Sequence, residues 1–230
     1  MSMLLELEDI QFTWPGASRP VLDIPAFAMD EGEKVFLYGP SGSGKSTLLA
    51  LIGGLIAPDE GRVVCKQQTL NTLSRRGRDR FRAAELGVIF QQFNLLPWLD
   101  LENNVALPCR FSRQRAERAG DVRQEARRLL AAMDLPQADW TRRADALSVG
   151  QQQRVAAARA LIGQPALILA DEPTSALDSD RRNGFLDLLF EQAAQAGSGL
   201  LFVSHDQGLA TRFDRQLDLR AINQAEVAAA

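Results

Sequence analysis

The segment from Gly39 to Ser46, with the sequence GPSGSGKS, constrains the fold of this chain more than any other. It follows the short apolar run 34–38 and precedes the apolar stretch 48–55, so it lies between a predicted strand and a predicted helix. Glycines let backbone N–H groups curl around a phosphate, and the helix that begins near Lys45 adds its positive end. The pattern predicts a phosphate-binding loop in which Lys45 reaches the β- and γ-phosphates and Ser46 binds Mg²⁺. The candidate contacts are Gly39, Pro40, Ser41, Gly42, Ser43, Gly44, Lys45, Ser46 and Thr47.

Predicted strands and helices alternate along the chain. Alternating apolar and polar residues favour early strands over 3–12 and 21–28, and residues 61–65 favour another strand. The stretch from about 93 to 165 is rich in Arg, Ala, Leu and Gln and is predicted to be helical. Apolar residues at helical spacing favour one helix that begins near Val122.

Two further strands with a helix between them follow this helical stretch. Residues 166–170 and 200–203 are continuous apolar runs typical of buried strands, and 180–196 is a predicted helix. Strands that alternate with helices imply a largely parallel sheet, whose ligands lie at the carboxyl ends of the strands. The polar residues that follow the strands are therefore expected to converge on one site. They are Gly39, Asp171, Glu172 and His205.

Asp171 and Glu172 stand directly after the apolar strand at 166–170. Downstream of a phosphate-binding loop, a carboxylate in this place holds Mg²⁺ through water, which is the role expected for Asp171. Glu172 is then placed to polarise the attacking water as a general base. The alternative is an ordinary acidic pair at the end of a strand.

The composition limits the classes of partner. The chain has 230 residues, 46% of them hydrophobic, which is enough for a sizeable core in one domain. Its net charge of −3 argues against nucleic acid as the main partner, because a basic footprint is expected there. We find no run of about 18 apolar residues and no signal-peptide pattern, and therefore expect a cytosolic chain without a membrane span. Cys65 and Cys109 are expected to be free thiols.

The segment from Leu147 to Arg154, with the sequence LSVGQQQR, decides between classes of phosphate-binding proteins. It resembles the signature of the ABC ATPases, usually written L-S-G-G-Q-x-Q-R, at seven of its eight positions. Ser148 is a good cap for the helix that follows, and the start of that helix can point toward phosphate. The departure is Val149, a β-branched residue where the family usually has glycine, so we expect a working signature with somewhat altered geometry.

The resemblance to ABC ATPases covers about residues 4 to 220 and implies a fold. That fold is α/β, with a P-loop NTPase core on a mostly parallel sheet, an antiparallel β subdomain and an inserted α-helical subdomain. The chain would be a single ABC ATPase domain, residues 1–230. The core and β subdomain would comprise about 1–90 and 166–225, and the helical subdomain about 93–165.

The resemblance also implies roles for residues outside the phosphate-binding loop. Gln91 is similar to the Q-loop glutamine, a ligand of Mg²⁺ and water, although Gln92 stands next to it. His205, the only histidine of the chain, is similar to the switch histidine that contacts the γ-phosphate. Trp14 matches the aromatic residue that stacks on adenine, with Phe12 as the competitor and a plain turn-side tryptophan as the alternative. The remaining nucleotide contacts implied by the family are Ser148, Gly150 and Gln151 in the signature and Asp178 in the D-loop.

In this family, two copies bind head to tail with two ATP molecules between them. The resemblance therefore implies that Ser148 and Gly150 of a second copy complete the site formed by Lys45, Asp171 and Glu172 of the first. ATP and Mg²⁺ are the implied cofactors. ATP would join the two copies, and hydrolysis would release them.

The stretch from Gly87 to Pro97, together with Leu101–Val105 and Pro108, looks like the ATPases of the MacB/LolD/FtsE group. This resemblance implies an integral membrane permease of the FtsX/MacB type as partner, and a place at the cytoplasmic face of the inner membrane. The apolar loop 93–98 would line the groove that receives a cytoplasmic helix of the permease. The alternative for this loop is plain core packing.

Other functions within the same family share these motifs. An FtsE-like signalling ATPase that controls a cell-wall hydrolase has nearly the same sequence pattern, and a solute-importer ATPase is a further alternative. A soluble ABC protein of DNA repair or translation would carry two ATPase units or large inserted arms, for which this chain has no room.

Two arginine-rich stretches remain, Arg75–Arg82 and Arg110–Arg128. The default interpretation of such stretches is a solvated face. The alternative is proximity to anionic lipid at the inner leaflet.

Overall fold

The computed structural model of the chain describes residues 2–175 and 179–225. These residues form two compact units. The first comprises the chain up to Arg82 together with the part from Gly199 onward, and the second runs from Ala83 to Ser198. Among residues 2–175 and 179–225, no helix combines the length and the apolar character needed to cross a membrane.

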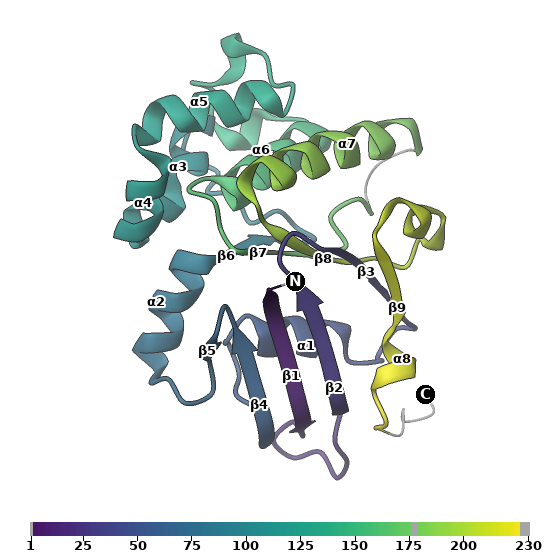
Figure 1. The fold of residues 1–230 in the computed structure, drawn as a ribbon. Coiled ribbons are helices and arrows are strands. Elements are labelled where there is room, and N and C mark those ends of the chain that lie inside the picture. The colour runs from purple at the N-terminus through teal and green to yellow at the C-terminus, as the bar shows by residue number, and fades with distance from the viewer. Residues whose placement is uncertain (1, 176–178, 226–230) are drawn as a thin grey trace. The chain divides into compact units, whose positions relative to one another are not determined.

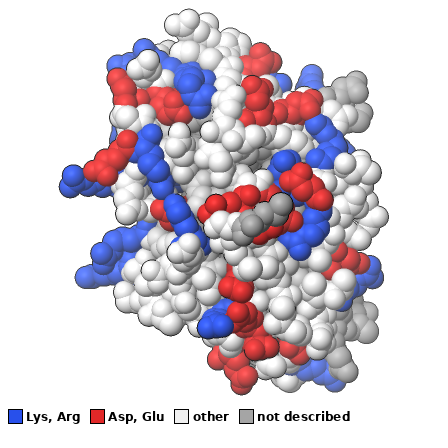
Figure 2. Space-filling model, viewed as in Figure 1, with Lys and Arg blue, Asp and Glu red and all other residues white. Residues whose placement is uncertain are grey.

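The first unit contains an antiparallel sheet with the strand order β2-β1-β4-β5 (Figure 1). Its strands are β1 (Met3–Phe12), β2 (Leu22–Asp30), β4 (Glu60–Cys65) and β5 (Gln68–Thr69). Alternate residues of β1, such as Leu5 and Leu7, are fully buried, whereas Glu6 and Glu8 are partly exposed on the other face. Figure 2 shows acidic side chains gathered over this sheet. The strands predicted at 3–12, 21–28 and 61–65 are therefore confirmed as β1, β2 and β4, whereas the short β5 was not predicted.

The first unit also contains parallel strands. β3 (Lys34–Tyr38) lies between β8 (Gly199–Val203) and β9 (Arg215–Asp218) and is parallel to both. Phe36 packs against Phe202 and Phe213, with ring centroids 6.2 and 5.2 Å apart. The strands predicted at 34–38 and 200–203 are confirmed, whereas β9 was not predicted.

Four helical elements belong wholly or partly to the first unit. They are α1 (Lys45–Ile52), α2 (Arg75–Glu85), the 3₁₀ helix Gln207–Arg212 and α8 (Leu219–Ile222). Helix α1 begins at Lys45, as expected from the phosphate-binding loop, although the apolar stretch begins only at residue 48. It ends before Gly54, which adopts a φ of +64°. Helix α2 carries five arginines and buries only Ala84, so it has no apolar stripe by which to recognise it in the sequence. Figure 2 shows its basic side chains on the surface.

The second unit contains two parallel strands and most of the helices. Strand β6 (Leu86–Ile89) pairs with β7 (Leu167–Asp171). The helices are α3 (Leu101–Phe111), α4 (Arg113–Ala119), α5 (Val122–Ala132), α6 (Val149–Leu161) and α7 (Ser179–Ala196), with 3₁₀ turns at Gln137–Asp139 and Ala144–Ala146. The predicted helical character of 93–165 and the predicted strand at 166–170 are confirmed.

Helix α6 is the central helix of this unit, because it packs against α3, α5, α7 and β6. Its residues Ala156, Ala157 and Ala158 are fully buried, and their small side chains let the neighbouring elements approach closely. The closest approach is at Gly87 of β6, where a Cβ atom would lie 2.4 Å from the carbonyl oxygen of Ala160. Only glycine fits there, which explains why the strand before Gln91 contains one.

The prediction that Arg110–Arg128 forms a solvated face is wrong for Arg115, which is 2% exposed. Its guanidinium donates hydrogen bonds to the carbonyl oxygens of Leu86 (3.0 Å), Ala160 (2.6 Å) and Ile162 (2.8 Å). These three carbonyls compensate the cost of burying the charge. Burial nevertheless lowers the pKa of Arg115 to about 10, so the group stays charged at neutral pH. Arg115 therefore joins α4 to the start of β6 and the end of α6.

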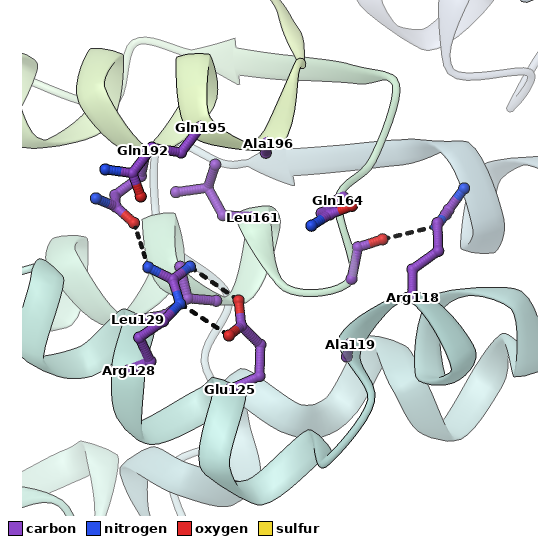
Figure 3. A pocket seen from close by; sticks show the side chains of 11 residues that line it. Arg118, Ala119, Glu125, Arg128, Leu129, Leu161, Gln164, Gln192, Gln195 and Ala196 are labelled. Carbon is purple, nitrogen blue, oxygen red and sulfur yellow. Dashed lines mark hydrogen bonds and ion pairs between the residues drawn. The ribbon is translucent and has the colours of Figure 1, made fainter.

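Arg128 of the same stretch lines a pocket of about 280 Å³ in the second unit (Figure 3). It donates two hydrogen bonds of 2.8 Å to the carboxylate of Glu125 and one of 2.8 Å to Gln192 on α7. Figure 3 shows these side chains pointing toward one another across the pocket. Arg128 thus holds α5 against α7 as well as facing solvent.

Candidate functional site

The phosphate-binding loop lies between β3 and α1 of the first unit, as the sequence predicted. Gly42 and Gly44 adopt φ values of +78° and +99°, which a residue with a Cβ rarely adopts. At Gly44, a Cβ atom would also lie 2.9 Å from a methyl group of Leu22 and 3.1 Å from the carbonyl oxygen of Val21. Gly44 caps α1 without a side-chain hydrogen bond. The backbone N–H groups at the start of α1 are therefore not satisfied by a cap and suit an anion.

The polar side chains of the loop are hydrogen-bond donors that fit phosphate. The Lys45 ammonium donates to the carbonyl oxygens of Gly39 (2.8 Å) and Pro40 (2.9 Å), which holds its charge within the loop. The buried Ser43 hydroxyl has no hydrogen-bond partner among the described residues. The ammonium of Lys45, the hydroxyl of Ser43 and the N–H groups at the start of α1 are donors of the kind that the phosphates of a nucleotide require.

Two aromatic side chains lie beside α1. The Trp14 indole N–H donates to the hydroxyl of Thr47, at 3.3 Å, and 45% of Trp14 is exposed. Phe12 packs edge-on against Trp14 with ring centroids 5.0 Å apart, and it is only 6% exposed. Trp14 therefore offers an accessible ring next to the phosphate-binding loop, whereas Phe12 belongs to the core.

His205 stands at the same edge of the parallel strands as the phosphate-binding loop. Strands β3 and β8 are parallel with Leu37 opposite Val203, and the N–H of Ser204 donates to the carbonyl oxygen of Leu37, at 3.2 Å. His205 is the next residue and is exposed. Within the first unit, the histidine and the start of the loop therefore follow neighbouring strand ends.

In the second unit, the predicted Mg²⁺ ligands and general base also follow neighbouring strands. Ile89 of β6 lies opposite Ala170 of β7, so Gln91 and Asp171 come just after adjacent parallel strand ends. Gln91 is exposed, and Asp171 is half-buried. Glu172 is half-buried as well and adopts a φ of +46°, which is uncommon for a residue with a side chain. Such backbone outliers gather at functional sites because the surroundings must hold them in place.

The signature segment forms the start of α6. The Ser148 hydroxyl accepts a hydrogen bond from the N–H of Gln151 (3.3 Å), and the Gln151 side chain accepts one from the N–H of Ser148 (3.0 Å). The Gln151 amide also donates to Asp139, at 3.0 Å. This capping box orders the turn that carries Ser148 and Gly150. Val149 is the first helical residue and is 50% exposed, so its side chain does not disturb the start of the helix. Asp178 of the predicted D-loop lies outside the described residues.

The comparisons with known proteins identify the family. The family model for ABC transporters matches residues 22–175. The chain belongs to this family. An uncharacterized ABC transporter ATP-binding protein of Mycobacterium tuberculosis, Rv0986, is 38% identical over 219 residues, which cover 94% of this chain and 87% of that protein.

Solved structures agree with this assignment. The ATP-binding cassette MJ0796, in a dimeric post-hydrolysis state bound to ADP and Pi, matches with a TM-score of 0.83 and 34% identity over 99% of this chain and 100% of that one. The cassette cbiO1 from Clostridium perfringens, part of the transporter complex cbiONQ, matches with a TM-score of 0.81 over 95% of this chain and 85% of that one. At 22% identity, this second likeness speaks for the fold alone.

The chain is therefore an ATP-binding, ATP-hydrolysing subunit of the ABC transporter family. The predicted ABC ATPase fold is confirmed, with parallel strands, an antiparallel sheet and a set of helices. The roles of the individual site residues remain predictions.

Sequence reasoning missed several residues that hold the site in place. Asn223, 9% exposed, accepts from the N–H of Asp23 (2.8 Å) and donates to the carbonyl oxygens of Val21 (3.0 Å) and Ser43 (3.4 Å). It thus ties the phosphate-binding loop to β2 from a point 180 residues further along the chain. Asp139 supports Gln151 in the signature segment in a comparable way. No local pattern marks either residue, because each acts through a contact that is distant in sequence.

Proposed function

We propose that this chain is the ATPase subunit of a MacB/LolD-type complex, bound to an FtsX-like permease at the cytoplasmic face of the inner membrane. In this proposal the chain works as a head-to-tail dimer with two ATP molecules at the interface. The dimeric state of the ADP- and Pi-bound cassette MJ0796, which is 34% identical, supports the dimer. Opening and closing of the dimer is the motion that reaches the permease.

Each residue of the proposed site has a chemical task. Lys45 and the loop N–H groups hold the β- and γ-phosphates, and Trp14 stacks on the adenine. Glu172 accepts a proton from the attacking water, while His205 contacts the γ-phosphate. The partner copy supplies Ser148 and Gly150.

The proposed Mg²⁺ ligands are Ser46, Gln91 and Asp171. They offer a hydroxyl, an amide oxygen and a carboxylate, which are the hard oxygen donors that Mg²⁺ prefers. The ion, when bound, neutralises charge on the β- and γ-phosphates during phosphoryl transfer.

The exposed side chain of Trp98 is the main support for the proposal that the chain binds a permease. Trp98 lies in the apolar loop that follows Gln91, and 64% of it is exposed. Phe93 of the same loop is only 6% exposed, so the core-packing alternative holds for Phe93 and not for Trp98. An exposed tryptophan is the kind of side chain that anchors protein interfaces, because its large rigid surface is buried at a small entropic cost. Because Trp98 lies in the loop that follows Gln91, a partner bound there would be connected to the proposed site through that loop.

We expect Trp98→Ser to separate the permease from the ATPase without changing basal ATP hydrolysis. A matched control is Phe111→Ser, which removes another exposed aromatic side chain, 74% exposed, at the last residue of α3, a helix about 15 Å long. The measurement is co-purification of the chain with a co-expressed FtsX-like permease, together with permease-stimulated ATPase activity. Loss of an interface anchor costs about 2 kcal/mol or more of binding free energy. The affinity for the permease should therefore fall roughly 30-fold, and less permease should co-purify with the variant.

Equal retention of the Trp98→Ser and Phe111→Ser variants would contradict a docking role for this loop. Failure of the unaltered chain to bind any FtsX-like permease, with binding to a solute-importer permease instead, would overturn the assignment to the MacB/LolD type.

A further inference from the structure

Arg159 near the end of α6 is buried and contacts the loop that follows Gln91. The side chain is 8% exposed. One terminal nitrogen donates to the carbonyl oxygen of Asn94, at 2.6 Å, and the other donates to that of Phe93, at 2.5 Å. A planar guanidinium with two parallel donors fits two successive carbonyls, whereas a lysine ammonium has no such fixed fork.

The backbone that Arg159 contacts is in an uncommon conformation. Phe93 and Asn94 are successive non-glycine residues with φ values of +58° and +49°. Each such residue costs of order 1 kcal/mol relative to the ordinary regions. The turn is closed by hydrogen bonds from Phe93 N–H to Phe90 O (2.9 Å) and from Asn94 N–H to Gln92 O (2.6 Å). Gln91 lies inside this turn, so the direction of its side chain depends on the turn being kept.

The buried charge of Arg159 is used to hold this turn. Burial lowers the pKa of Arg159 to about 10, which leaves the guanidinium charged at neutral pH. The carbonyl dipoles of Phe93 and Asn94 compensate that charge. The same two hydrogen bonds hold the backbone of the loop in place. Arg115 is a useful contrast, because it is similarly buried and bonded to three carbonyls, none of which belongs to the loop after Gln91.

Helix α6 connects this contact with the signature segment. Ser148 caps the helix, and Arg159 lies about 16 Å further along it. Helix α6 therefore carries the signature segment at its start and the contact to the loop after Gln91 near its end.

We propose that Arg159 is a positioning residue for Gln91: its guanidinium fixes the left-handed turn at Phe93 and Asn94, and the turn aims the Gln91 amide at Mg²⁺ and the attacking water. This inference rests on the role of Gln91 in the proposed function. Arg159 itself touches neither nucleotide nor metal.

The test is a double-mutant cycle on the full chain, combining Arg159→Lys with Gln91→Ala and measuring kcat and KM for ATP at saturating Mg²⁺. The second readout is the affinity of the same variants for ATP as a function of Mg²⁺ concentration, from calorimetric titration, and Arg159→Lys is expected to weaken the Mg²⁺-dependent part of binding only while Gln91 is present. Arg159→Lys alone is expected to lower kcat about tenfold, the size of one lost charge-assisted hydrogen bond, with KM nearly unchanged. In the Gln91→Ala background the same substitution is expected to change kcat less than about twofold, because the residue that it positions is gone. Arg115→Lys is the control and should act by the same factor in both backgrounds.

A second variant tests the turn from its exposed side, without altering the core. Asn94 is exposed, and Asn94→Val disfavours a positive φ, whereas Asn94→Gly permits it. Asn94→Val is expected to lower kcat about fivefold when Gln91 is present and to have little effect on kcat in the Gln91→Ala background. Asn94→Gly should leave kcat near that of the unaltered chain. This arm stays informative even where Arg159→Lys lowers the yield of folded protein.

The outcomes separate this inference from the proposed function. If Gln91→Ala lowers kcat but Arg159→Lys and Asn94→Val act by equal factors in both backgrounds, the positioning role is overturned and the role of Gln91 stands. If Gln91→Ala leaves kcat unchanged, the role of Gln91 in the proposed function is overturned, and the inference with it.

Discussion

Lys45→Ala is expected to reduce ATP binding below detection at micromolar concentrations of nucleotide. The Lys45 ammonium is held within the phosphate-binding loop by the carbonyl oxygens of Gly39 and Pro40, at 2.8 and 2.9 Å. Its removal takes away the one side-chain cation of the loop and also the two hydrogen bonds that shape the loop. Removing one partner of a shielded charge pair costs roughly 2–5 kcal/mol, so affinity should fall by about 30-fold to several thousandfold.

Calorimetric titration with ATP, with and without Mg²⁺, measures this loss. Lys34→Ala is the matched control, because it removes the same charge from β3 of the same unit. Lys34 forms a partly exposed ion pair with Asp214 at 3.1 Å, and such a pair contributes at most about 1 kcal/mol to stability. If Lys45→Ala binds ATP with unchanged affinity, the loop is not part of the nucleotide site. If Lys45→Ala and Lys34→Ala lose the same affinity for ATP, the loss is a general effect of charge.

The elements next to the site could be predicted from sequence because local patterns specify them. Strands β3, β7 and β8 are continuous apolar runs that end in polar or glycine residues. The phosphate-binding loop is set by glycines at positions that need a positive φ, and such a requirement is visible in one short segment. The start of α6 could likewise be recognised from Ser148 and Gln151, which form the capping box.

The contacts that hold the site together could not be predicted, because they join residues distant in sequence. Arginine-rich stretches look alike whether the guanidinium faces water or bonds to buried carbonyls. Arg115 bonds to residues 29 to 47 positions away, and Arg159 to residues 65 and 66 positions away. Only the packing of α4 and α6 brings those carbonyls within reach. Helix α2 was missed for a different reason, since a helix with one buried residue shows no hydrophobic period.

The apolar loop after Gln91 shows the same limit within six residues. From the sequence, the apolar loop 93–98 could be interpreted either as a core segment or as a docking surface. The structure divides the loop, since Phe93 is buried beneath the contact from Arg159 while Trp98 is exposed. At the start of the loop, Phe93 and Asn94 both adopt a positive φ, and Phe93 is buried while Asn94 is exposed. Nothing in the residue types Phe and Asn requires such a turn.

Glu172→Gln is expected to retain ATP binding and to slow hydrolysis by roughly 10²- to 10⁴-fold, the contribution of a general base. Glu172 follows the last residue of β7, and its carbonyl oxygen accepts the N–H of Ser175, at 3.3 Å. Its φ of +46° turns the chain out of the strand direction at this residue. Glutamine has the same shape and can adopt the same backbone, so the substitution removes the basic oxygen and little else. Single-turnover hydrolysis together with a binding titration separates the two effects.

The same variant tests the proposed dimer, because ATP that binds without being hydrolysed should keep two copies together. Sedimentation velocity of Glu172→Gln is expected to show monomers without nucleotide and dimers with ATP and Mg²⁺. Glu191→Gln is the control, since it makes the same change at an exposed position of α7, where Gln195 donates to the carboxylate. It should hydrolyse ATP normally and form no lasting dimer. Near-normal turnover of Glu172→Gln would show that Glu172 is not the general base. Slow turnover by a variant that stays monomeric with ATP would support Glu172 as the base. It would also exclude a site completed by Ser148 of a second copy.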